Sequence, residues 1–196
     1  KGALSGFNDF IKDWRTQLTA AGTALFAIAK STANYGDELA KMGQRLGTTV
    51  QETARLQHAA RLSDSDLQGL SSTVAFLSKN MLEASRGNQE VQQAFDRLGV
   101  KVTTTSGSLK GTTDILLELS DRFRLMPDGP EKLALAMGVL GKSAKEVLPL
   151  LNSNMREAFQ ETKELGLEMS ERATKAAEQF NDQLTKLQGA AQGVGN

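Results

Sequence analysis

His58 is the only histidine of this 196-residue chain, and histidine is the side chain best suited to moving protons near neutral pH. On the helix expected here, Leu56, Ala59 and Ala60 share one face and His58 points roughly the other way. The chain offers no cysteine or second histidine to share a metal, and no nucleophile at a diagnostic spacing. We therefore expect an ordinary surface histidine, without a catalytic or metal-binding role.

Acidic side chains recur at helical spacing in two places. They are Asp114, Glu118 and Asp121 in the first, and Glu157, Glu161, Glu164 and Glu168 in the second. Paired carboxylates can hydrolyse glycosidic bonds when they face each other across a cleft. Neighbouring turns of one helix do not form a cleft, however, and basic residues such as Arg156 and Lys163 are interleaved with them. Solvated helical faces are the favoured interpretation, and no catalytic residue is predicted.

Glycine spacing gives no cofactor signal either. Gly107 with Gly111 and Gly189 with Gly193 match G-x-x-x-G, but neither pair lies in an apolar run of about twenty residues. No strand is followed by a glycine-rich loop and a helix, which is the arrangement that cradles phosphates. We therefore expect no cofactor.

The amino-acid composition restricts the classes of partner that the chain could bind. Lys plus Arg and Asp plus Glu number 23 each, so the basic excess of a dedicated nucleic-acid binder is missing and no specific nucleic acid is expected. The longest apolar stretch, Ala20–Ala29, is about half of the roughly twenty residues that a membrane span needs. Membrane contact is therefore not supported. Low aromatic content, at 5%, favours helices with narrow apolar seams.

An apolar repeat with alternating spacings of three and four runs through residues 1–46. A repeat of this kind keeps one seam of a helix facing a partner helix, as in coiled coils. Small residues seven apart lie beside the seam at Gly22, Ala29, Gly36 and Gly43, where they would allow close approach or else break the helix. The seam consists of Leu4, Phe7, Ile11, Trp14, Leu18, Ala21, Leu25, Ile28, Thr32, Tyr35, Leu39, Met42 and Leu46.

Residues 47–167 are punctuated by helix start and stop signals. Pairs of Ser or Thr with Glu or Gln three residues later predict capping boxes. These pairs are Thr49 with Glu52, Ser65 with Gln68, and Ser143 with Glu146. The expected helix ends are Gly47, Gly87, Gly99 and Gly141. Pro130 suits the first position of a helix, whereas Pro149 should kink or restart one.

One stretch, residues 100–105, alternates apolar and polar side chains as a strand does, and Ser106 and Gly107 supply a turn after it. At most one short β-hairpin, near residues 100–110, is therefore expected. The heptad spacing returns near the C-terminus, in residues 168–196. Its seam consists of Ala173, Ala177, Phe180, Leu184, Leu187, Ala191 and Val194.

The expected fold is therefore all-α. Long amphipathic, coiled-coil-like helices at residues 1–46 and 168–196 flank a compact multi-helix middle at residues 47–167. As a hypothesis, the two seams mediate self-association of the chain.

The stretch Leu39–Asn152 resembles the core region of phage and prophage tail tape measure proteins. The resemblance depends on the order of segments: "LAKMGQRLGTTVQETARLQHAARLSDSDL", a break at Gly87 and Asn88, "QAFDRLGVKV", "TTDILLELSDRF" and "DGPEKLALAMGVLGKSAKEVLPLLN". It covers more than half of the chain. The chain begins with Lys1 rather than Met, which favours a fragment or a processed start.

The resemblance implies a structural role and no enzymatic activity. Tape measure proteins lie in the lumen of the growing tail, set its length, and leave ahead of the DNA at infection. They associate as a few copies, so a trimer is favoured here and a hexamer is possible. The partners implied are tail tube and tail-tip or baseplate proteins and tail assembly chaperones. The implied locations are the virion, in the tail lumen or tip, and the host cytoplasm during assembly.

Three alternatives remain. A helical coiled-coil adapter or secretion-associated protein would use the same heptads to bind partners, without depending on tail components. A wall-degrading domain of a tail protein would hydrolyse purified peptidoglycan. A membrane-active segment built on Ala20–Ala29 would cause liposomes to leak.

Overall fold

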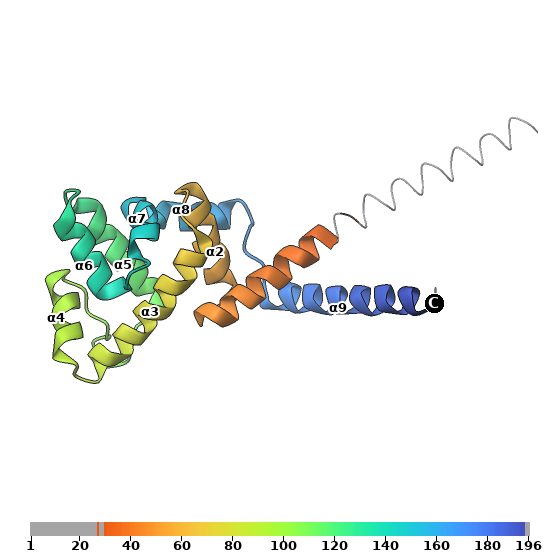
Figure 1. The fold of residues 1–196 in the computed structure, drawn as a ribbon, viewed down its shortest axis with the longest axis horizontal. Coiled ribbons are helices and arrows are strands. Elements are labelled where there is room, and N and C mark those ends of the chain that lie inside the picture. Colours follow the sequence, from red (N-terminus) through yellow and green to blue (C-terminus); the bar gives the residue numbers. More distant parts are fainter. Residues whose placement is uncertain (1–26, 28–29, 195–196) are drawn as a thin grey trace, which may run out of the picture. The chain divides into compact units, whose positions relative to one another are not determined.

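The computed structural model describes residue 27 and residues 30–194 (Figure 1). The regular structure in those residues is helical apart from one isolated β-bridge, so the all-α prediction is confirmed. Contacts within the chain divide it into two units, one of which is Leu39–Glu171; the other comprises the segments on either side. The sequence predicts boundaries of the compact middle at residues 47 and 167.

The described part of the first helix covers residues 30–46 and ends at Gly47, whose φ of +65° is the left-handed conformation that closes many helices. Near its end, Gly43 is buried against the turn that follows. A Cβ at this position would lie 2.9 Å from Thr53 Oγ1 and 3.0 Å from the carbonyl oxygen of Thr48. Gly43 is one of the small residues spaced seven apart, and it lets the helix lie close to the turn that follows.

The helices of the unit Leu39–Glu171 follow one another through short connections apart from one longer loop, residues 98–111 (Figure 1). After the end of the first helix they are α2 (Val50–Leu62), α3 (Leu67–Ser85), α4 (Gln89–Arg97), α5 (Thr112–Leu125), α6 (Pro130–Leu140), α7 (Ala144–Asn152) and α8 (Met155–Glu164). Beyond a linker of residues 165–170, α9 (Glu171–Val194) is 24 residues long.

The core of this unit is built around α3. Leu70, Val74, Leu77 and Met81 recur at spacings of four and three, so they share one face of α3, and none is more than 1% exposed. This helix contacts α4, α5, α6 and α7, while α2 packs mainly against α8. Each fully buried side chain of this size contributes about 1.5–3 kcal/mol through the hydrophobic effect.

Local signals set most of the helix ends. The capping box of Thr49 and Glu52 is confirmed: Thr49 Oγ1 accepts a hydrogen bond from the Glu52 N–H, and Glu52 Oε2 accepts one from the Thr49 N–H. Pro130 is the first residue of α6, as predicted. Helix α7 continues through Pro149 rather than restarting there.

Two predicted capping boxes are wrong. Asp66, not Ser65, caps α3, because its carboxylate accepts the N–H of Gly69. The Ser65 hydroxyl accepts instead a hydrogen bond from the N–H of Leu150, at 3.1 Å. Ser143 has helical backbone angles and makes no side-chain cap, so the Glu146 N–H bonds to the Ser143 carbonyl.

The strand-like stretch forms the single antiparallel bridge between Thr103 and Leu109. Hydrogen bonds flank it from the Thr104 N–H to the Ser108 carbonyl and from the Lys110 N–H to the Val102 carbonyl. The expectation of at most one short hairpin near residues 100–110 is confirmed for the described residues. Coiled-coil packing of the terminal segments stays a prediction.

Candidate functional site

Most of the predicted N-terminal seam lies outside the described residues. This applies to Leu4, Phe7, Ile11, Trp14, Leu18, Leu25 and Ile28. Their role in self-association therefore stays a prediction from the heptad spacing alone.

The described seam residues of the first helix differ in burial. Leu39 and Leu46 are buried, at 0% and 3% exposed, whereas Tyr35 and Met42 are half-buried. Leu46 belongs to the core of the unit Leu39–Glu171, and Met42 packs against that core. Leu39 and Leu46 are thus covered within the chain itself.

In the C-terminal seam, Phe180 and Leu184 on α9 are half-buried. Ala177 is buried, at 8% exposed. The side chain of Leu187 lies outside what the structure describes. Self-association through this helix also stays a prediction.

The prediction that His58 lies on the surface is wrong. Its side chain is only 15% exposed, because α8 covers that side of α2. His58 Nε2 lies 3.4 Å from Glu161 Oε2 but makes no hydrogen bond. The error arises because helical spacing reports the face of α2 that meets α3 and α7, and not the contact with α8.

The acidic faces are largely engaged in ion pairs. Asp121 Oδ2 lies 2.7 Å from Arg156 Nη2, and Glu118 Oε1 lies 2.7 Å from Lys110 Nζ. Glu168 does not share the helical face predicted for it, because α8 ends at Glu164. The carboxylate of Glu168 instead binds Arg55 on α2. Glu118 and Asp121 thus neutralise neighbouring cations, and Glu168 joins the segment after α8 to α2.

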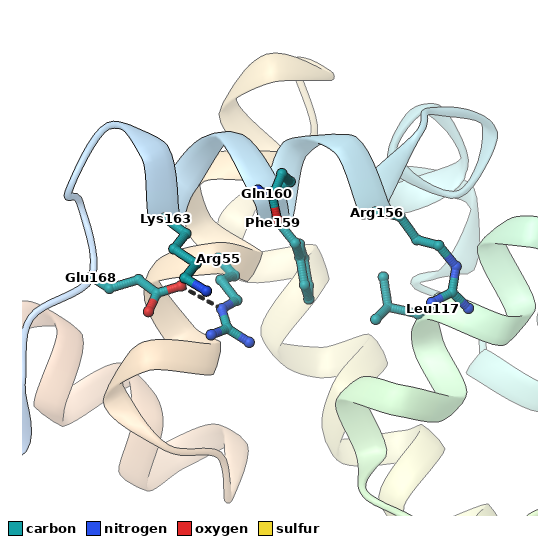
Figure 2. A pocket seen from close by; sticks show the side chains of 7 residues that line it. All are labelled: Arg55, Leu117, Arg156, Phe159, Gln160, Lys163 and Glu168. Carbon is teal, nitrogen blue, oxygen red and sulfur yellow. Dashed lines mark hydrogen bonds and ion pairs between the residues drawn. The ribbon is translucent and has the colours of Figure 1, made fainter.

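A pocket of about 290 Å³ opens between α2, α5 and α8 (Figure 2). It is lined by Arg55, Leu117, Arg156, Phe159, Gln160, Lys163 and Glu168. Figure 2 shows Phe159 projecting from α8 between Lys163 and Arg156, with Leu117 contributed by α5. The pocket therefore combines an apolar floor with cationic side chains at its rim.

The ion pair at one end of the pocket is short and partly screened from water. Arg55 Nε donates to Glu168 Oε1 at 2.7 Å, and the two side chains are 34% and 19% exposed. This hydrogen bond raises the pKa of Arg55, against the opposing effect of burial, and the charges of Glu168 and Glu52 raise it further. The hydrogen bond to Asp121 likewise raises the pKa of Arg156. Both guanidinium groups therefore stay charged at any physiological pH.

No pattern in the sequence predicts this pocket. Arg55 and Glu168 are 113 residues apart, and nothing in their local spacing connects them. In the sequence, Lys163 and Arg156 only interrupt an acidic helical face. A pocket assembled from three helices depends on tertiary packing, which single-helix periodicity cannot reveal.

Neither a metal site nor a membrane span is found in the part of the chain that the structure describes. No group of three or more His, Cys, Asp or Glu side chains is placed to hold a metal ion there. Among the same residues, no helix is both long and apolar enough to cross a membrane.

Comparison of the chain with protein-family models, with curated proteins and with solved structures finds no match.

Proposed function

We propose that this chain is a structural segment of a phage tail tape measure protein and has no catalytic role. The observation that carries the proposal is that the resembling stretch, Leu39–Asn152, lies entirely within the unit Leu39–Glu171. A resemblance scattered across separate units would imply much less than one that lies within a single folded part.

The quoted segments supply core residues rather than exposed polar groups. "LLELSDRF" places Leu116, Leu119 and Phe123 in the core, each at most 1% exposed. "LPLLN" contributes Leu150 and Leu151, both at 0%. These segments therefore specify a fold. That supports a structural role, because an enzymatic motif would have to expose the groups that react.

A folded unit constrains where such a protein can lie. Helices packed around a common core occupy more width than an extended rod, and a tail tube is narrow. We place this unit at the tail-tip end, where the channel widens, and assign the lumen to more rod-like parts of the parent protein. The terminal heptads provide the self-association, with three copies favoured.

An in-frame deletion in the encoding phage tests the proposal. Removing three heptads, residues 4–24, shortens a continuous helix by about 32 Å at 1.5 Å per residue. We expect tails shortened by a comparable amount in electron micrographs. The matched control replaces the same residues with an unrelated helical sequence of equal length, which should restore the original length. Tails of unchanged length in the deletion would contradict a tape measure role.

A tagged parent protein separates this proposal from an adapter role. A tape measure segment should be recovered in purified virions and lost from particles that have released their DNA. Recovery only in host complexes without tail components would favour the adapter.

A further inference from the structure

The linker that leaves α8 is folded back onto α2. Gly166, with φ of +65°, closes α8, and the Leu167 N–H bonds to the Thr162 carbonyl at 3.0 Å. This is the hydrogen-bond pattern of a Schellman turn, which reverses the direction of the chain after a helix. The reversal brings Glu168 to Arg55, and their ion pair joins the linker of residues 165–170 to α2.

The lining of the pocket beside this ion pair carries more cations than carboxylates. It includes Arg55, Arg156 and Lys163 but only one carboxylate, that of Glu168. Asp121, beyond the lining, pairs with Arg156. Lys163 is the lining cation whose ammonium group makes no hydrogen bond or ion pair with the described residues.

The size and floor of the pocket further restrict its ligand. About 290 Å³ accommodates one or two side chains and not a whole helix. Leu117 and Phe159 offer an apolar surface next to the cations. A carboxylate with an apolar neighbour fits both features. The linker already presents this combination, because Leu167 and Met169 flank Glu168.

We propose that this pocket is a binding site for an acidic segment of a partner protein, and that Glu168 is its internal competitor. An incoming carboxylate takes the place of Glu168 on Arg55 and gains the charge of Lys163 as well. The exchange frees residues 165–170 from α2, and α9 begins directly after them. Because the Arg55–Glu168 pair is partly exposed to water, it contributes little to stability and can be exchanged. The inference does not depend on the tail assignment.

Peptide binding to the full chain tests the site. The probe is a fluorescein-labelled, amidated peptide with the linker sequence ELGLEMS, residues 164–170. Glu168→Gln vacates the pocket, whereas in the unmodified chain Glu168 competes at the millimolar effective concentration typical of a short tether. We expect the variant to bind the peptide about tenfold more tightly than the unmodified chain does.

Matched controls identify the groups responsible. A peptide with Gln at the position of Glu168 keeps only the carboxylate of Glu164 and should bind Glu168→Gln severalfold more weakly than the original peptide does. Adding Arg55→Gln or Lys163→Gln to Glu168→Gln should weaken binding of the original peptide severalfold. No binding to Glu168→Gln, or equal binding of the two peptides, would overturn the site.

Amide hydrogen exchange tests the release of the linker. At saturating peptide, the amides of residues 165–170 in the unmodified chain should exchange faster, while those of α3 keep their protection and so report an intact fold. Unchanged exchange of the linker at saturation would show that Glu168 is a permanent structural partner, and would overturn the release.

Discussion

The two sides of the unit Leu39–Glu171 are held together in different ways. Around α3, apolar side chains from four neighbouring helices meet, and the Asn80 amide donates to two backbone carbonyls, while the buried Thr73 hydroxyl makes no hydrogen bond with the described residues. Beside α2, polar side chains take part as well: Arg55 forms a partly exposed ion pair with Glu168 of the linker, and His58 lies beside Glu161 of α8. The apolar packing around α3 permits a single arrangement, because no group of a partner protein can replace the buried side chains. A partly exposed ion pair can exchange one carboxylate for another.

The difference suggests a division of roles. The α3 side should carry the stability of the unit and tolerate little change. The contact between α2 and α8 also buries apolar side chains, among them Leu56 and Phe159, but the ion pair at its edge should contribute little stability and should respond to partners. Substitutions on the two sides can test this division, because each side offers matched variants.

The largest effect is expected for Phe123→Ala in α5. Phe123 is 0% exposed, and its removal leaves a cavity in the core that should cost about 3–5 kcal/mol of unfolding free energy. Urea denaturation followed by circular dichroism measures it. Leu125, in the same helix, is 80% exposed, and Leu125→Ala should change stability by less than about 0.5 kcal/mol. If both variants lost a similar amount of unfolding free energy, the core would not lie around Phe123 as the structure shows.

A pair of glycines at the end of α6 should give effects of opposite sign. Gly141 has φ of +77°, and a Cβ there would lie 2.9 Å from the Phe76 ring, so Gly141→Ala should destabilise by about 1–3 kcal/mol. At Gly138, inside α6, a Cβ would meet only the Ala94 Cβ, at 4.0 Å. Gly138→Ala should stabilise by up to about 1 kcal/mol. Thermal unfolding compares the two, and effects of the same sign would be inconsistent with this packing.

Buried polar groups on the α3 side should have intermediate effects. Asn80 Nδ2 donates to the Val139 carbonyl at 3.2 Å and the Gly138 carbonyl at 3.3 Å. Asn80→Ala leaves these carbonyls at the end of α6 without that donor and should cost about 1–3 kcal/mol. The control is Ser72→Ala, whose exposed hydroxyl bonds only to its own helix, at the Gln68 carbonyl. Equal, small losses in urea denaturation would refute a role for Asn80 in joining α3 to α6.

The smallest effect on stability is expected for Arg55→Ala, at about 0.2–1 kcal/mol, because the ion pair is partly exposed. The pKa of Arg55 is raised in the folded state, so its contribution is present at all pH values below its unfolded pKa and is lost only as the pH rises through the higher folded one. Because the guanidinium stays charged, the melting temperatures of the unmodified chain and of Arg55→Ala should differ by the same amount from about pH 6 to about pH 9. A difference that shrinks across that range would show that another group governs the pair.

Local signals explain what the sequence predicted correctly. The capping box of Thr49 and Glu52 is complete within four residues, so it could be found without a structure. Ser65 could not be assigned, because its partner, the Leu150 N–H, is 85 residues away. Asp66, which caps α3 instead of Ser65, is the next residue along the chain. Distant partners explain both errors near α8 as well, at His58 and Glu168.

Multi-angle light scattering over a concentration series shows whether the terminal heptads assemble the chain while Leu39–Glu171 remains a monomer. The two samples are the full chain and residues 39–171. We predict a trimer, or a hexamer, for the full chain and a monomer for the fragment at every concentration. A monomer for both would contradict it, because the seams would then be satisfied within one chain.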